Sequence, residues 1–254
     1  MGADPRDPER GLTRRFARVA ALADVHGNAP ALEAVLAEVE VEEPDLIVFC
    51  GDLTWGPLPE ETLDLVRGLD ARFVRGNAER TLLEAPAEPT ERTRFQAERH
   101  DRDALEFIRG FEEAVVVEVD GLGPTRFCHG SPRSDEELVT PETPVERVRD
   151  FLEGVGERAV VTAHTHVSYE RIVEGTRLLN PGSVGLPYEG RPGAYWALLG
   201  PGIEHRRTEY DLDKAERRIR ADGGPFADLT MELIRTPPSR DEAIEHAEMR
   251  GFSG

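Results

Sequence analysis

Five short polar motifs follow apolar runs in the sequence, and their side chains are of the types that bind metal ions. Together their candidate ligands are four of the seven histidines, two aspartates and the asparagine Asn77. The motifs are Asp24-Val25-His26-Gly27-Asn28, Gly51-Asp52, Gly76-Asn77, His129-Gly130 and His164-Thr165-His166. Imidazole nitrogens with carboxylate and amide oxygens suit Mn, Fe, Co, Ni or Zn better than Ca. We therefore expect a transition-metal site.

The number of donor side chains favours two ions over one. Each motif alone is also a common turn sequence, because Asp, Gly and Asn favour turns after strands. In His164-Thr165-His166, however, the two imidazoles of an extended chain point the same way and can converge on one ion. A single tetrahedral zinc needs only three or four ligands. Seven donors fit two ions that share one carboxylate.

The apolar runs predict the strands that position these motifs. They are of strand length, and each motif follows one of them. The predicted strands are Val19 to Ala23, Leu46 to Cys50, Arg72 to Arg75, Val115 to Val119, Thr125 to Cys128, Ala159 to Ala163, Arg177 to Leu179, Tyr195 to Leu199 and Ile203 to Arg207. Polar residues at such strand ends converge on one sheet edge, where open α/β folds place their sites.

Helices are predicted between several of the strands. An apolar stripe over Leu32 to Val39 indicates one helix, with Asn28 placed to cap it. Thr143-Pro144-Val145-Glu146 has the pattern of a capping box that starts another. A charged helix is predicted over Glu91 to Arg109. Strands and helices alternate at first and strands dominate after Val115, which indicates an α/β domain.

The chain of 254 residues divides into three predicted segments: a polar N-terminal tail at 1–15, an α/β domain at 16–210 and a C-terminal helical extension at 211–254. Gly223-Gly224-Pro225 and Pro237-Pro238 are expected to break the helices of the extension. The start lacks the apolar run of a secretory signal, and no run reaches the roughly 20 apolar residues of a membrane span. We expect a cytoplasmic protein without membrane contact. The sequence is compatible with a monomer and with a homo-oligomer.

The net charge of −19 limits the partners that the protein can bind. Such a surface repels a phosphate backbone, so we expect no binding to duplex nucleic acid. A small phosphate ester can still bind, because metal cations reverse the field locally. Cys50 and Cys128 lack a paired zinc spacing, and each ends an apolar run, so both are expected to be buried and inert.

In this order and spacing the five motifs resemble those of the calcineurin-like metallophosphoesterase superfamily. Asp24 to Asn28 and the later Asn180-Pro181-Gly182-Ser183-Val184-Gly185 are similar to its small bacterial and archaeal phosphodiesterase branch. The resemblance covers roughly Arg18 to Tyr210. It implies a four-layer α/β/β/α sandwich with a dinuclear metal site at the strand ends. It also implies that a metal-bound hydroxide hydrolyses a phosphate ester.

The resemblance implies a role for each candidate ligand. The first ion would be held by Asp24, His26, Asp52 and His166. The second would be held by Asp52, Asn77, His129 and His164, with Asp52 bridging. His129 and Asn77 would also take part in catalysis. The cofactors would be two divalent transition-metal ions, with Mn expected and Fe, Ni, Co or Zn as alternatives.

One departure from the family pattern concerns the proton donor. Many members have a histidine, which helps to protonate the leaving group, where Gly76-Asn77-Ala78-Glu79 has Ala78. His100 is the candidate proton donor in its place, and the alternative is that His100 is only an exposed histidine on a helix. Arg133 is a candidate phosphate ligand or an ordinary surface arginine. Asn28 is a candidate substrate contact or only a helix cap, and Asn180 to Ser183 is expected to be a structural turn.

Three functions fit these features. The first is hydrolysis of a small phosphodiester, such as a cyclic or dinucleoside phosphate. The second is a phosphomonoesterase, protein phosphatases included, which the acidic surface and Ala78 disfavour. The third is a non-catalytic protein-interaction scaffold, as in the retromer subunit with this fold, whose metal set is incomplete. Here every ligand position is filled, which favours an enzyme.

Overall fold

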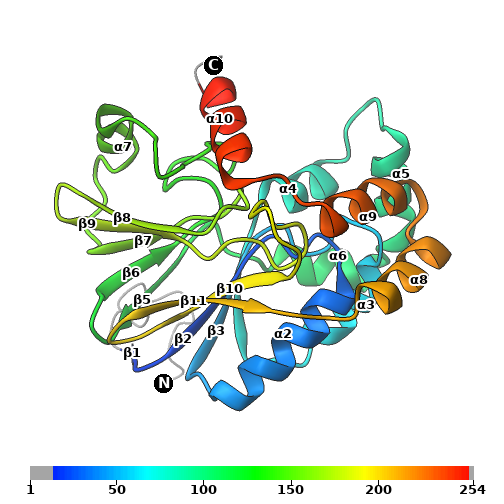
Figure 1. Ribbon diagram of the computed structural model, residues 1–254, viewed down its shortest axis with the longest axis horizontal. Coiled ribbons are helices and arrows are strands. Elements are labelled where there is room, and N and C mark those ends of the chain that lie inside the picture. The colour runs from blue at the N-terminus through cyan, green and yellow to red at the C-terminus, as the bar shows by residue number, and fades with distance from the viewer. Residues whose placement is uncertain (1–13, 252–254) are drawn as a thin grey trace, which may run out of the picture.

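Two β-sheets lie face to face in the structure, a computed structural model that describes residues 14–251 (Figure 1). The five-stranded sheet has the order β11-β10-β2-β3-β4 and the six-stranded sheet the order β1-β5-β6-β7-β9-β8. The first comprises β2 (Val19–Leu22), β3 (Leu46–Cys50), β4 (Ala71–Val74), β10 (Ala194–Leu199) and β11 (Ile203–Thr208). The second comprises β1 (Arg15–Phe16), β5 (Val115–Val119), β6 (Gly123–Phe127), β7 (Ala159–Val161), β8 (Tyr169–Val173) and β9 (Thr176–Asn180).

Alternation along the strands builds the layers. Val19 and Ala21 of β2 belong to the apolar core between the sheets, together with Val115 and Val117 of β5. Their neighbours Ala20 and Leu22 point the opposite way and pack against helices. This follows from the period of two in a strand, which gives each sheet one inward and one outward apolar face. The predicted α/β/β/α sandwich is confirmed.

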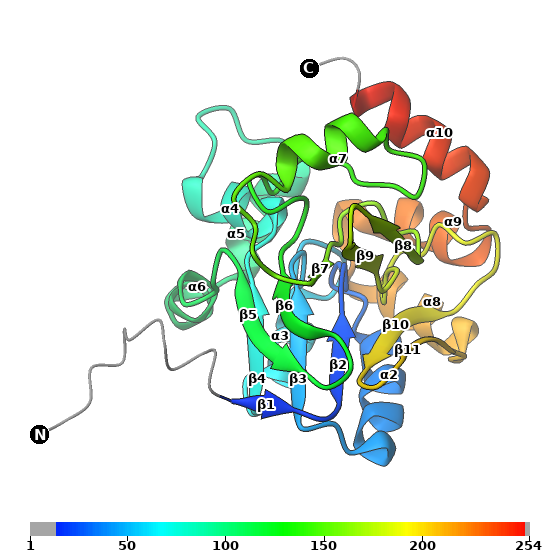
Figure 2. The same ribbon diagram turned by 90° about the vertical axis from the view of Figure 1, so that its left-hand side faces the viewer.

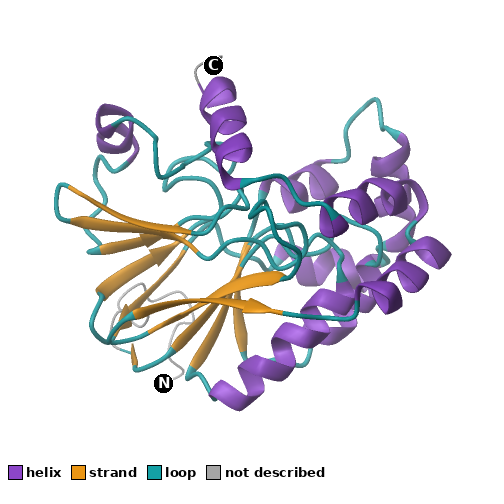
Figure 3. Cartoon of the chain, viewed as in Figure 1, coloured by secondary structure: helices purple, strands orange, loops and turns teal. Residues whose placement is uncertain are grey.

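The helices are distributed unevenly over the two outer faces (Figure 3). The five-stranded sheet is covered from the outside by apolar side chains of four helices: α2 (Ala29–Glu42), α3 (Pro59–Val66), α4 (Asn77–Glu84) and α6 (Arg102–Arg109). On the six-stranded sheet, the outer core uses the short helix α7 (Val145–Phe151) and the loop residue Val139. The fourth layer is therefore much thinner than the first.

The C-terminal segment forms α8 (Leu212–Asp222), the short 3-10 turn η1 (Gly224–Phe226), α9 (Ala227–Arg235) and α10 (Arg240–Gly251). The predicted breaks at 223–225 and 237–238 separate these helices. Apolar residues of α8 and α9, among them Ile219 and Met231, pack on Ala29 of α2 and on Leu58. In contrast, α10 lies away from α2 on the loop side of the sheets (Figures 1 and 2).

The division into three segments stays a prediction. All but the last two residues of the predicted tail at 1–15 lie outside the described residues, and Arg15 pairs in β1 with Glu118. None of the helices within 14–251 combines the length and apolar character needed to cross a membrane. Both cysteines are buried and unpaired, as expected, and burial raises the pKa of Cys128 to about 12.

Two predicted helix features are wrong. The charged helix is broken into α5 (Glu91–Arg99) and α6, because Asp101 caps α6 by accepting a hydrogen bond from the Ala104 amide at 2.7 Å. The predicted capping box does not form, since the Thr143 hydroxyl instead accepts from the Thr140 amide at 2.9 Å and donates to Glu248. The strands β1 and β8 were not predicted, since β1 has only two residues and β8 is largely polar.

Candidate metal centre

The five motifs meet because they follow strands that run in parallel. β2, β3 and β4 are parallel neighbours in one sheet, and β6 and β7 are parallel neighbours in the other. Their carboxyl ends therefore lie at the same edge of the sandwich. Two hydrogen bonds join the edges of the two sheets. The His164 amide donates to Asp24 Oδ2 at 3.1 Å, and His129 Nδ1 donates to the Cys50 carbonyl at 2.8 Å.

One group of candidate ligands consists of Asp24, His26 and His166, whose ligand atoms all lie within 4.8 Å of one another. The Nε2 atoms of the two histidines are 3.1 Å apart, and His166 Nε2 is 3.6 Å from Asp24 Oδ1. This Asp24 oxygen is buried and has no hydrogen-bond partner among the described residues. A buried carboxylate oxygen of this kind is costly unless a cation or a proton compensates for it.

The second group consists of Asp52, His129 and His164, with Asn77 beside them. His129 Nε2 is 3.2 Å from His164 Nδ1 and 3.0 Å from Asn77 Oδ1. Asp52 faces both groups, since its Oδ1 is 3.4 Å from His129 Nε2 and its Oδ2 is 3.6 Å from His26 Nε2. The carboxylate thus has the position of a bridge between two sites.

Backbone carbonyls set the tautomers of three histidines. The tautomers decide which ring nitrogens are free to bind a metal ion. The Nδ1 atoms donate to carbonyl oxygens at distances of 2.6–3.1 Å; the pairs are His26 with Trp55, His129 with Cys50, and His166 with Leu186. Each Nε2 of a neutral ring therefore presents a lone pair to the cluster. Two such lone pairs at 3.1 Å repel each other, whereas nitrogens about 2.1 Å from one ion at about 90° would be about 3.0 Å apart. The donor set fits bound metal.

Burial and mutual charge keep most of these ligands ready to bind a cation. Burial lowers the pKa of His166 well below its usual range and that of His164 to about 4, so both rings are neutral at pH 7. Burial alone would raise the pKa of Asp52, but His129 and His26 outweigh it and lower the pKa. At His129, burial alone would lower the pKa, but the negative charges of Asp52 and Asp24 outweigh it and raise the pKa. Without a cation, His129 holds its proton more tightly than the other rings.

The backbone of the cluster is strained. Five of the candidate ligands have φ between 47° and 64°, in the left-handed region that side chains disfavour: Asp24, His26, Asp52, His164 and His166. Such conformations cost on the order of 1–3 kcal/mol each and persist only where the surroundings enforce them. Gly76 also packs closely against this part of the cluster, because a Cβ at position 76 would lie 2.2 Å from Asp52 Oδ1. Only glycine at position 76 leaves room for this carboxylate.

Glu79 is a supporting residue to which the sequence had assigned no role. Its buried carboxylate accepts hydrogen bonds from three backbone amides, those of Asp52 at 2.9 Å, Leu53 at 2.7 Å and Gly76 at 2.8 Å. It therefore joins the Gly51-Asp52 loop to the Gly76-Asn77 loop. Its position three residues after Gly76, as in a capping box, is the sequence signal that could have identified it.

The turn at 180–185 is structural, as predicted. The Ser183 hydroxyl and the Gly185 amide both donate to the Asp24 carbonyl, at 2.7 and 3.0 Å. Asn28 caps α2 by accepting from the Ala31 amide at 3.3 Å, and its own amide donates to the Gly185 carbonyl at 2.9 Å. Asn28 is fully buried and does not line the pocket, so its position is that of a helix cap, and a substrate contact by Asn28 stays a prediction.

The structure does not bring His100 to the cluster. The residue ends α5 and is buried, with Nδ1 donating to the Gln96 carbonyl at 2.7 Å and Nε2 3.0 Å from the Thr54 hydroxyl. The exposed alternative is therefore wrong, and the role of His100 as proton donor stays a prediction for a residue that does not line the pocket. Arg133 lies with His129 in a hollow of about 280 Å³, but its guanidinium is paired with the Glu137 carboxylate at 2.6 Å.

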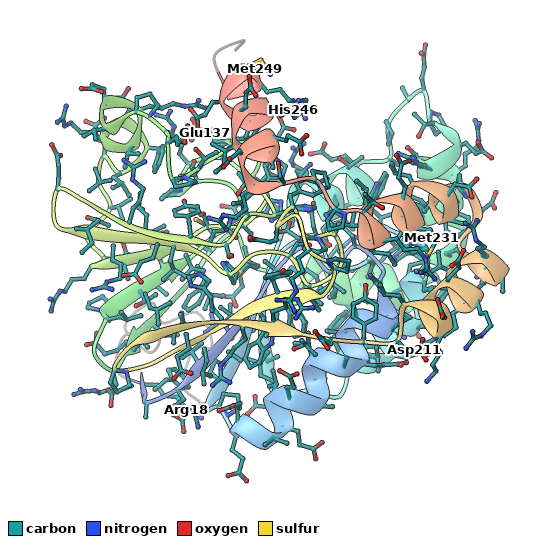
Figure 4. The ribbon with its side chains drawn as sticks, in the orientation of Figure 1. Arg18, Glu137, Asp211, Met231, His246 and Met249 are labelled. Carbon is teal, nitrogen blue, oxygen red and sulfur yellow. The ribbon has the colours of Figure 1, made fainter. Side chains whose placement is uncertain are left out.

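A larger pocket of about 870 Å³ opens over the cluster. His26, Asp52, Asn77, His164 and His166 form its floor. Its sides come from Ala78, Trp55 and Tyr188, and from the C-terminal helices. These last residues, which the sequence did not predict, are Leu229, Leu233, Pro238, Glu242, Ala243, His246, Ala247 and Arg250. Figure 4 shows the side chain of His246 projecting from α10.

The fold and the clustered ligands are those of a metallophosphoesterase. The chain belongs to the calcineurin-like phosphoesterase superfamily, whose domain model matches residues 18–199. It is 25% identical over 228 residues, 79% of this chain and 91% of the other, to an uncharacterised protein of Methanocaldococcus jannaschii. The expected family is therefore confirmed.

Two crystal structures show the same fold. A hypothetical protein from Pyrococcus horikoshii has a TM-score of 0.74 at 19% identity, over 89% of this chain and all of that chain. A metallophosphoesterase from Sphaerobacter thermophilus has a TM-score of 0.69 at 23% identity, over 87% of this chain and 98% of that chain. Both alignments reach well beyond residues 18–199, so at least part of the C-terminal extension has a counterpart in them.

Proposed function

We propose that the protein is a metal-dependent phosphodiesterase that acts on a small phosphate ester. The observation that carries this proposal is the position of Asp52, whose two oxygens face separate groups of histidines. A carboxylate between two donor groups suits a pair of dications about 3.5–4 Å apart. In this assignment Asp24, His26 and His166 hold one ion, Asn77, His129 and His164 hold the other, and Asp52 bridges them.

Bound metal would supply a Lewis acid and a water of lowered pKa, which serves as the nucleophile at neutral pH. The chain itself supplies the geometry. Backbone carbonyls orient the histidine rings, and Glu79 holds the Asp52 loop in place through its three amide contacts. The pocket above the cluster admits the phosphoryl group from the solvent side. This arrangement supports in-line displacement of an alcohol.

Two features favour a diester over a monoester. Ala78 lines the pocket with a methyl group, so it supplies no proton to a poor leaving group. A pocket of about 870 Å³ also has room for an organic group on either side of the phosphate. Mn is the proposed metal, because the mixture of nitrogen and oxygen donors suits it.

The test is hydrolysis before and after removal of metal. Protein freed of metal by chelation, with the loss verified by elemental analysis, is assayed with phosphomonoesters, phosphodiesters, cyclic nucleotides and dinucleoside polyphosphates. We expect no activity until Mn, Ni or Zn is added, and then activity mainly on diesters. Full activity without metal would contradict the proposal. A metal-free protein that stays inactive with every added ion would favour the scaffold function.

A further inference from the structure

The helices α9 and α10 line part of the pocket with apolar side chains and with the polar residues Glu242, His246 and Arg250. Leu229 and Leu233 are four residues apart on α9, so they lie on one face of the helix, and both line the pocket. Leu229 is 40% exposed, so its side chain is accessible to a ligand. Ala243 and Ala247 line the pocket from α10. We call these four residues the wall.

An aromatic ring lines the same pocket as the wall. Trp55 follows the Asp52 loop and lines the pocket, and its ring packs edge-to-face on Phe226 with centroids 6.2 Å apart. Because Phe226 belongs to η1, the C-terminal segment also fixes this ring. The Trp55 carbonyl accepts the hydrogen bond from His26 Nδ1. The tryptophan thus connects the C-terminal segment to a candidate metal ligand.

The helix α10 is anchored at both ends, so its part of the wall is already formed. Near its start, the Arg240 guanidinium donates to the Ser168 carbonyl and to the Glu189 carboxylate, both at 2.7 Å. Near its end, Glu248 accepts hydrogen bonds from the hydroxyls of Thr140 and Thr143 at 2.5 and 2.7 Å. A preformed surface that combines apolar side chains with some polar groups is typical of a small-molecule site.

We propose that the wall and Trp55 select the organic group of the substrate. A phosphate ester whose organic group carries a planar ring, such as the base of a nucleoside, would bind with this ring against Leu229, Leu233 and Trp55, and with its phosphate on the cluster. A bare phosphate would use only the floor of a pocket whose volume is near the upper end for small-molecule sites, about 300–1,000 Å³. Aromatic and aliphatic side chains provide the contact area that such a group needs. The inference rests on the proposed phosphodiesterase function.

The test compares two diesters that share the leaving group 4-nitrophenol, methyl 4-nitrophenyl phosphate and thymidine 5′-(4-nitrophenyl phosphate), in the presence of Mn. Wild type should have a KM about tenfold lower for the thymidine ester. Leu229→Ser should raise that KM about fivefold, since it removes an apolar contact. The KM for the methyl ester and both kcat values should stay unchanged.

Two further variants keep the test decisive. Ile172→Ser replaces another exposed apolar residue, 62% exposed on β8 and outside the pocket, and should alter neither KM. Ala243→Trp narrows the space at the wall and should raise the KM for the thymidine ester only. Thermal melts verify that each variant is folded.

The possible outcomes separate the two proposals. If wild type hydrolyses both esters with equal KM, or if the wall variants change both esters alike, the wall does not select and this inference alone is overturned. If wild type hydrolyses neither ester with Mn, Ni or Zn, the phosphodiesterase function is overturned and this inference with it.

Discussion

The floor and the wall of the pocket are built in opposite ways. The floor consists of five candidate ligands at the strand ends, four of which have a left-handed backbone. The wall consists of helical residues, all but Ala247 at least partly exposed, that need no unusual backbone. The floor is held by hydrogen bonds inside the sandwich, such as those of Glu79. Surface groups such as Arg240 anchor the wall.

This difference indicates how each region tolerates change. A substitution in the floor leaves buried polar or charged atoms without partners, which costs metal binding and stability together. A substitution in the wall changes contact with solvent and ligand and leaves the interior intact. We therefore expect floor variants to change the metal affinity or kcat and wall variants to change the KM for large substrates.

The largest effect is expected for Asp52→Asn. It removes the negative charge that allows two dications to sit close together, so activity should fall by more than about 100-fold, beyond the range for residues that only support a ligand. Asn28→Ala is the matched control, since it removes a helix cap worth about 1 kcal/mol and leaves the floor intact. Initial rates and thermal melts measure both. Equal losses of activity in two equally folded variants would remove the bridging role of Asp52.

The next largest effect concerns proton donation to the leaving group. With Ala78 at the pocket, wild-type rates should depend steeply on the pKa of the leaving group, because general-acid help is worth about 10²–10⁴-fold. Ala78→His should flatten this dependence, with a gain of about 10²-fold on the poorest leaving groups. Rates for a series of aryl and alkyl diesters measure the slope.

His100→Ala serves as the control for that series. Because both ring nitrogens of His100 are engaged by Gln96 and Thr54, the variant should leave the slope unchanged and lower only the stability. A shallow wild-type slope that becomes steep in His100→Ala would restore His100 as the acid.

A smaller effect is expected for Glu79→Gln. The Gln amide would place N–H groups against backbone amides that now donate to a carboxylate, so the Asp52 loop should shift. Loss of such a supporting contact typically weakens metal binding about 10–100-fold. A calorimetric titration with Mn measures it. Glu84→Gln, an exposed carboxylate on the same helix, should bind Mn like wild type, and an unchanged affinity in Glu79→Gln would refute the supporting role.

The smallest effect is expected at the anchor of the wall. Glu248→Gln weakens the contacts to Thr140 and Thr143, so α10 should be less firmly held. The KM for the thymidine ester should rise about threefold, the scale of a lost contact of roughly 0.6 kcal/mol, and kcat should stay constant. Glu245→Gln, which is exposed on α10 and does not line the pocket, is the control. A fall in kcat would assign Glu248 to the floor instead.

Some features could be predicted from the sequence because they depend on local order. Each motif stands directly after an apolar run, and a run of four to six apolar residues makes a buried strand largely by itself. The positions of Asp24, Asp52 and His129 at strand ends follow from this alone. The turn at 180–185 was predictable in the same way, from the preferences of Asn, Pro and Gly.

The tertiary structure decided which distant segments meet, because packing between segments depends on the whole core. His100 is predicted to be exposed because it lies in a charged segment. The helix instead ends before Asp101, and His100 is buried against Thr54. Glu79 reads as one acid among 50 Asp and Glu residues until its carboxylate is seen to hold two loops. From the sequence, α9 and α10 look like a polar extension. Long-range contacts such as those of Arg240 and Glu248 place α10 beside the metal-ligand cluster, and local sequence patterns do not reveal them.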